Sequence, residues 1–150
     1  MRKSLSVIIL TTFIFSLSSF ALTKADNFDY EDYYRLGYTK LLEGAFDDCI
    51  GLFQKSVEIK PTSAEAYLGL GMAYRQLGQL DKALDSTKKA LQYNPKYYKA
   101  YYNLGLIYEA QGNNAQALKA YKTFYNKTPE ARNIPGFENK IDRLEKAAGT

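Results

Sequence analysis

The chain lacks the residues on which most catalytic sites are built. It contains no histidine, no tryptophan and one cysteine, Cys49, among 150 residues. Without histidine the usual nucleophile–base pairs and zinc sites cannot be assembled, and a single cysteine excludes an intramolecular disulfide. The glycines do not form a phosphate-binding loop either. The composition therefore predicts a protein that is not an enzyme and that has no cofactor and no metal site.

Neither sign of charge dominates the sequence. There are 20 lysines and arginines against 16 aspartates and glutamates, a net charge of +4. Residues 1–25 hold three of the basic residues and none of the acidic ones, so the remainder carries only +1. A nucleic-acid-binding protein needs a concentrated basic face. We therefore expect no nucleic-acid partner.

Long apolar runs are also scarce, and the single one lies at the start of the chain. Residues 5–20 (LSVIILTTFIFSLSSF) carry no charge, follow Arg2 and Lys3, and precede the small-residue exit ALTKA. This layout predicts a signal peptide, residues 1–25, and an exported protein that is periplasmic or secreted. Cleavage after Ala25 is favoured over Ala21 because it leaves a polar segment before the cut. The alternative is an uncleaved membrane anchor, although the run is shorter than the ~20 residues of a spanning helix.

Prolines are few, but their spacing reveals an internal repeat. Three of the four prolines, Pro61, Pro95 and Pro129, are each 34 residues apart. Other residues share this period, at Gly37, Gly71 and Gly105, at Gly44, Gly78 and Gly112, at Leu36, Leu70 and Leu104, and at Tyr33, Tyr67 and Tyr101. Several residue types sharing one period over three copies indicate a solenoid of stacked units.

Each unit has the pattern of a helical hairpin. Tyr67, Leu70, Gly71 and Tyr74 fall at i, i+3, i+4 and i+7, which is one buried face of a helix. The first glycine of each unit allows the second helix to approach closely, the second glycine ends the first helix, and the proline ends the second. Thr62, with Glu65 three residues on, predicts a capping box. No segment alternates as a strand does, so the predicted fold is all-α.

The repeat resembles the tetratricopeptide repeat (TPR). The resemblance places repeats at residues 30–63, 64–97 and 98–131 and a capping helix at 137–148, within a domain spanning residues 26–148. It implies a right-handed α-solenoid of three antiparallel helix hairpins plus that cap. Two departures stand out: Thr87 replaces the usual aromatic of repeat 2, and Phe124 occupies a small-residue position of repeat 3.

In proteins similar to this one the first helices line a concave groove that holds another polypeptide. The residues at the groove positions predict an exposed apolar and aromatic stripe flanked by cations, which comprises Tyr34, Arg35, Tyr38, Leu68, Met72, Arg75, Lys99, Tyr102, Asn103 and Leu106. Exposed aromatics with arginine are typical of binding hot spots. One subclass of the family clamps a peptide's terminal carboxylate, but of the five clamp positions here (Tyr34, Tyr38, Gly69, Lys99 and Asn103) only Lys99 conforms.

The leading hypothesis is thus a non-enzymatic protein–protein interaction module in the periplasm or secreted space, with a protein or peptide partner in the groove. Two alternatives remain open. The protein could be a self-associating scaffold, a homo-oligomer in which one chain's end helix occupies a neighbour's groove. It could also be a membrane-tethered assembly factor, if the signal segment is not cleaved.

Overall fold

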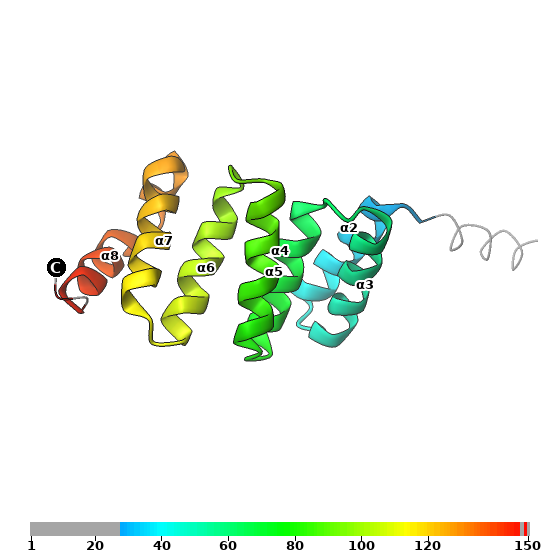
Figure 1. Cartoon of the computed structure of the whole chain (residues 1–150), viewed down its shortest axis with the longest axis horizontal. Coiled ribbons are helices and arrows are strands. Elements are labelled where there is room, and N and C mark those ends of the chain that lie inside the picture. The colour runs from blue at the N-terminus through cyan, green and yellow to red at the C-terminus, as the bar shows by residue number, and fades with distance from the viewer. Residues whose placement is uncertain (1–27, 148, 150) are drawn as a thin grey trace, which may run out of the picture.

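A computed structural model describes residues 28–147 and Gly149. The predicted signal peptide and both predicted cleavage sites lie outside the described residues. Within the described part the chain forms only helices, in three hairpins followed by a short connection and a last helix (Figure 1). These are α2 (Tyr30–Leu42), α3 (Phe46–Ile59), α4 (Ala64–Gln76), α5 (Leu80–Tyr93), α6 (Tyr98–Ala110), α7 (Asn114–Lys127), η1 (Pro129–Asn133) and α8 (Phe137–Ala147). The all-α prediction is confirmed.

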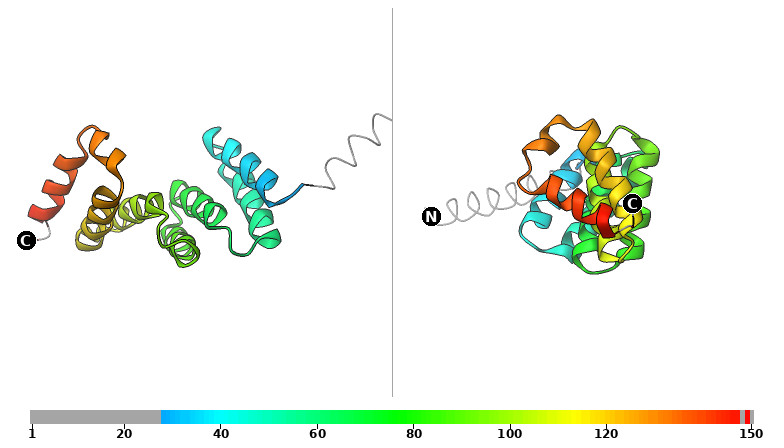
Figure 2. Two further views of the ribbon diagram at one scale, coloured as in Figure 1. Left: turned by 90° about the horizontal axis from the view of Figure 1, so that it is seen from above. Right: turned by 90° about the vertical axis from the view of Figure 1, so that its left-hand side faces the viewer.

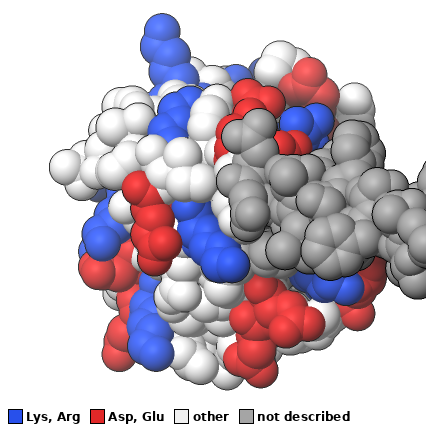
Figure 3. All heavy atoms as spheres, turned by 90° about the vertical axis from the view of Figure 1, so that its right-hand side faces the viewer, with Lys and Arg blue, Asp and Glu red and all other residues white. Residues whose placement is uncertain are grey.

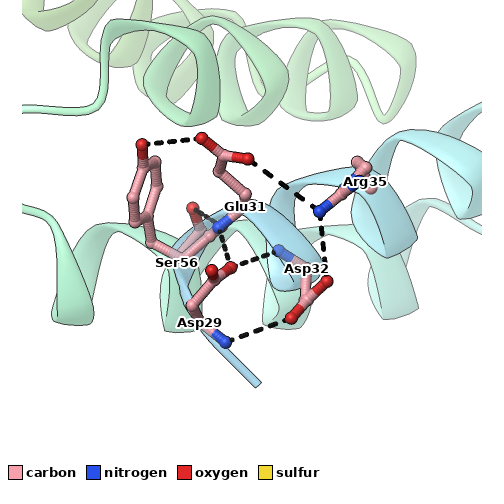
Figure 4. Close-up of polar contacts among 6 residues, drawn as sticks. Asp29, Glu31, Asp32, Arg35 and Ser56 are labelled. Carbon is pink, nitrogen blue, oxygen red and sulfur yellow. Dashed lines mark hydrogen bonds and ion pairs between the residues drawn. The ribbon is translucent and has the colours of Figure 1, made fainter. Parts of the chain in front are cut away.

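Side-chain caps define where two of the three first helices, α2 and α4, begin. At α2 the Asp29 carboxylate accepts hydrogen bonds from the backbone N–H groups of Glu31 (2.8 Å) and Asp32 (2.9 Å), and Asp32 accepts from Asp29 N in return (Figure 4). The capping box predicted at Thr62 is wrong. The hydroxyl of Ser63 accepts from Ala66 N instead, because α4 begins one residue later than that prediction requires.

Glycines end each first helix as predicted. Gly44, Gly78 and Gly112 have φ of 78°, 71° and 74°, a left-handed conformation that residues with a Cβ rarely adopt. These turns reverse the chain within a few residues, so the two helices of each hairpin pack side by side.

Three mid-helix glycines, Gly37, Gly69 and Gly105, are packing sites for aromatic rings. The ring of Phe53, which is fully buried, fills the space beside Gly37 of its own hairpin and Gly69 of the next. A Cβ atom at Gly69 would lie 2.5 Å from that ring, and one at Gly105 would overlap the buried ring of Tyr121. The missing side chains therefore set how closely the helices approach.

The last helix closes one end of the row of hairpins. Phe137 of α8 is buried against four aromatic rings, at centroid distances of 5.4 to 6.1 Å, namely those of Tyr102, Tyr121, Phe124 and Tyr125. The Nζ atom of Lys140 lies 2.9 Å from the Glu109 carboxylate, which also accepts from the Tyr121 hydroxyl at 2.7 Å. Figure 2 shows the row bending into an arc with α8 at one end and α2 at the other. None of the described helices has the length and apolarity that a membrane span requires.

Replacing Gly105 by alanine tests whether the glycine gap is needed. The new methyl group would collide with a ring that has no free space to move into, so Gly105→Ala should lower the free energy of unfolding by about 1–3 kcal/mol. Gly51→Ala is the matched control. Gly51 also lies inside a helix but, unlike Gly105, it is exposed, and nothing lies within 4 Å of the position that its new methyl group would take. The Gly51→Ala change should therefore raise stability by up to ~1 kcal/mol. Urea denaturation measures both, and a gain for Gly105→Ala would contradict the packing argument.

Candidate functional site

The first helices of the three hairpins line one pocket of about 260 Å³. Its lining residues come from α2, α4, α6 and α7 and are Tyr34, Tyr38, Glu65, Leu68, Gly69, Met72, Arg75, Tyr97, Lys99, Tyr102, Asn103, Leu106 and Phe124. Pockets that hold drug-sized molecules usually measure about 300–1,000 Å³. A pocket of this volume is better suited to one or two side chains of a larger ligand.

The structure brings nine of the ten predicted groove residues to this pocket. The exception is Arg35, whose guanidinium lies 3.3 Å from the carboxylate of Asp32 and 3.9 Å from that of Glu31 on the same helix (Figure 4). Its side chain is well exposed and borders a separate hollow beside Lys60 and Ser63. Arg35 therefore pairs with two acidic neighbours one turn away and does not line the pocket.

The predicted stripe is less exposed than the sequence suggested. Tyr38 is 42% exposed, but Leu68 is only 4% exposed and Asn103 only 3%. Leu68 packs with Ala90 and Ala100 in the junction between the second and third hairpins, where Tyr97 also contacts it. Leu68 and Asn103 therefore form the floor of the pocket, and Tyr38 stands at its rim.

Four lining residues lie outside the predicted stripe. Glu65 and Gly69 belong to the first helix α4, but Tyr97 and Phe124 belong to no first helix. Tyr97 is the N-cap residue of α6, one position before that helix. Phe124 belongs to a second helix, α7, and reaches the groove, where its ring centroid lies 5.2 Å from that of Tyr102. The unusual aromatic at a small-residue position was the signal in the sequence that could have revealed Phe124.

A buried polar chain crosses from the second to the third repeat. The Nε atom of Arg75 donates to Asn103 Oδ1 (3.1 Å), and Asn103 Nδ2 donates to the hydroxyl of Thr87 (2.8 Å). Thr87, fully buried, donates in turn to the carbonyl of Ala83 at 2.7 Å. Both hydrogen-bonding ends of the Asn103 amide are thus used inside the protein. Asn103 fixes the guanidinium of Arg75 at the pocket wall.

The departure of repeat 2 from the aromatic pattern explains why these hydrogen bonds form. In the first and third repeats the fully buried rings of Phe53 and Tyr121 pack against the mid-helix glycines. In the second repeat the smaller Thr87 takes the place of the ring. Its Oγ1 atom and the amide of Asn103 pack beside Gly71. A hydroxyl buried at this point needs a partner, and Asn103 from the next repeat supplies it.

The phenol groups on one side of the pocket have raised pKa values. Burial, together with the neighbouring Tyr34, Glu65 and Tyr38, raises the pKa of Tyr97 to about 12. Burial, Tyr38 and Glu65 raise the pKa of Tyr34 in the same way. The hydroxyls stay protonated at neutral pH, beside a single carboxylate. Glu65 therefore gives this side of the pocket a negative charge, whereas the guanidinium of Arg75 lies against Asn103.

Neither metal binding nor thiol chemistry finds a suitable arrangement in the part of the chain that the structure covers. No cluster of three or more Asp, Glu or Cys side chains there is arranged to hold a metal ion. Cys49 is completely buried, its thiol donates to the carbonyl of Phe46 at 3.1 Å, and burial raises its pKa. A thiol in this state is a packing group rather than a nucleophile.

Family models identify the repeat. Models described as tetratricopeptide repeat match residues 52–85 and 98–131, and one described as TPR repeat matches residues 71–112. A solved structure of MamA has a TM-score of 0.74 and 31% identity, covering 86% of this chain and 74% of that one. The chain belongs to the tetratricopeptide-repeat family. No curated protein matches it by sequence.

More distant structures share the fold. The first TPR domain of Spaghetti (RPAP3), solved with the HSP90 peptide SRMEEVD, has a TM-score of 0.73 and 20% identity, covering 81% of this chain and 94% of that one. The TPR2B domain of yeast Sti1, solved in a complex with pHsp70, has a TM-score of 0.68 and 20% identity, covering 80% of this chain and 95% of that one. At this identity the likeness establishes the arrangement of helices alone.

Thr87→Val tests the buried polar chain. The substitution keeps the shape of the side chain but leaves the Asn103 amide without its acceptor, which should lower the free energy of unfolding by about 1–3 kcal/mol. Thr39→Val is the control, because the exposed Thr39 hydroxyl makes the same backbone bond one turn back, to Arg35 O at 3.1 Å. That variant should change stability by less than about 0.5 kcal/mol. Equal effects in chemical denaturation would show that the Asn103 bond contributes nothing.

Proposed function

We propose that the protein is an exported, non-enzymatic interaction module that binds a polypeptide in the groove formed by its first helices. The observation that carries this proposal is the pocket itself, into which three repeats bring aromatic and apolar side chains. Tyr38, Met72, Tyr102 and Leu106 all keep part of their surface accessible there. A contiguous set of such side chains on an accessible surface favours a protein ligand.

The related structures support the class of ligand. The RPAP3 domain was solved with an HSP90 peptide and the Sti1 domain in a complex with pHsp70, so the same helical framework holds polypeptides in those proteins. The pocket of the present chain differs in chemistry, because tyrosines stand at two of the positions that a carboxylate clamp would use, Tyr34 and Tyr38. We therefore infer a polypeptide ligand held mainly through side-chain contacts.

Export is the second part of the proposal and rests on residues 1–25. A positive start, an uncharged apolar run and a small-residue exit form the layout of a signal peptide. If the segment is removed, the module works free in the periplasm or the secreted space. If it is kept, the same groove would work beside a membrane.

Site-specific photocrosslinking in the native host tests the groove. p-Benzoylphenylalanine placed at position 38 should crosslink a polypeptide partner, because Tyr38 stands at the rim of the pocket. Position 93 is a closely matched control, since Tyr38 and Tyr93 are both 42% exposed. Each also contacts one other tyrosine ring, at 6.2 Å and 5.5 Å. Tyr93 lies on α5, a second helix, away from the pocket.

The crosslink pattern distinguishes the candidate functions. A partner crosslinked from position 38 and not from position 93 supports the groove. Crosslinks from position 93 alone would contradict it. A product of twice the chain's own mass from position 38 would favour the self-associating scaffold.

Cleavage of the signal peptide gives an independent prediction. The protein recovered from the exported fraction should begin at Asp26, because the polar segment before Ala25 suits processing at that point. Intact mass and amino-terminal sequencing measure this directly. A mature chain beginning at Leu22 would move the cut to Ala21, and an intact Met1 in the membrane fraction would establish an anchor.

A further inference from the structure

Three tyrosines and a glutamate meet on one side of the pocket, and we call them the tyrosine–glutamate corner. Tyr34 and Tyr38 come from α2, Glu65 from the first turn of α4, and Tyr97 from the N-cap of α6. The rings of Tyr34 and Tyr38 are 6.2 Å apart and inclined by 33°. Two repeats, through α2, α4 and the N-cap of α6, therefore contribute to one small surface of rings and oxygen atoms.

The oxygen atoms of the corner are open to a ligand. Among the described residues, nothing hydrogen-bonds to the hydroxyls of Tyr34, Tyr38 or Tyr97, and no lysine or arginine nitrogen lies within 4 Å of the Glu65 carboxylate. That carboxylate receives a single weak bond, from the Ser63 hydroxyl at 3.4 Å. Lysine and arginine side chains carry three and five N–H donors and no acceptor. They match a surface that is rich in acceptors.

The charge around the corner also favours a cation. The groups that raise the pKa of Tyr97 are all acids or phenols, and no described lysine or arginine opposes that shift. Arg75 lies ten residues further along α4 than Glu65, a rise of about 15 Å. Lys99 lies on the α6 side of the pocket and makes no ion pair with a described residue. Neither cation pairs with the Glu65 carboxylate, although Lys99 is two residues after Tyr97, and the cation that Glu65 does influence is Lys60 from the neighbouring hollow.

The chain itself places an ammonium group on a tyrosine next to this corner. The Nζ atom of Lys60 lies 4.1 Å from the ring centroid of Tyr30, in the hollow that also touches Tyr34 and Glu65. Acidic and basic side chains alternate over this end of the molecule, where neither sign prevails (Figure 3). Charge selection at the groove therefore comes from local contacts rather than from a field of one sign.

We propose that the tyrosine–glutamate corner binds the lysine or arginine side chain of the polypeptide partner, while a neighbouring apolar side chain of that partner lies against Leu68, Met72 and Leu106. The inference rests on the proposed function and adds the chemistry of the ligand to it. Aromatic faces attract ammonium and guanidinium groups, most strongly when these are partly removed from water. Glu65 adds an acceptor of opposite charge.

A selection of random heptapeptides on the purified protein tests this. Selected peptides should carry a lysine or arginine beside an apolar residue. Replacing that basic residue by methionine should weaken binding, measured by titration calorimetry, by about 2- to 30-fold, the range expected for a cation on aromatic rings. The inference would be overturned if the selected peptides lacked a basic residue. If those peptides also bound less well to a Tyr38→Ala, Met72→Ala double variant, the groove would still be their binding site.

Glu65→Gln locates the contact by a double-mutant cycle. In that variant the basic-to-methionine change in the peptide should matter clearly less than in the parent protein. Asp47→Asn is the control, because Asp47 is also an exposed first-turn acid, on α3, and its loss removes the same charge and the same helix-end interaction. A methionine penalty that is unchanged in Glu65→Gln would overturn the inference. Selected peptides that bind the Tyr38→Ala, Met72→Ala variant as tightly as the parent would overturn the groove itself.

Discussion

The contact on which the rest of the structure depends is that between a mid-helix glycine and one side chain of the facing second helix. Glycine inside a helix is unfavourable by about 1 kcal/mol relative to alanine, so its recurrence in each first helix needs compensation from packing. Phe53 beside Gly37 and Tyr121 beside Gly105 provide it with fully buried rings. The close approach that results fixes the angle between the helices, and with it which side chains of α2, α4 and α6 meet in the groove.

The middle repeat meets the same constraint with polar atoms. Thr87 is too small to fill the space that a ring would occupy, and Asn103 from the following repeat completes it through hydrogen bonds. These hydrogen bonds of Asn103 join two repeats and also hold the guanidinium of Arg75 in the groove wall. A local departure from the repeat pattern thus determines both the rigidity of a junction and the position of a charge.

The periodic features could be predicted from sequence because each depends on a single residue type. A proline or glycine at a fixed spacing has one structural consequence, and Gly44, Gly78 and Gly112 adopt the expected left-handed conformation. Burial and direction of side chains depend instead on neighbours from other repeats. That is why the buried state of Leu68 and the reach of Tyr97 required three-dimensional contacts. The ion pairs of Arg35 with Asp32 and Glu31 lie within one helix at three- and four-residue spacing, so the sequence did contain the signal for them. The predicted cap at Thr62 failed for a smaller reason, since α4 begins one residue later and Ser63 is its N-cap residue.

The two ends of the helical row differ in a way that gives the array a direction. Leu70 and Leu104 are 5% and 8% exposed because the preceding hairpin covers them, whereas Leu36 at the same repeat position is 39% exposed. At the opposite end Phe137 fills the place beside Phe124 and Tyr102 with an aromatic ring of its own. A further repeat gained by duplication could stack on α2 without displacing anything described, but at α8 it would first have to remove a packed helix. The length of the array, and therefore the number of ligand residues that it can read, is open to change from the amino-terminal side.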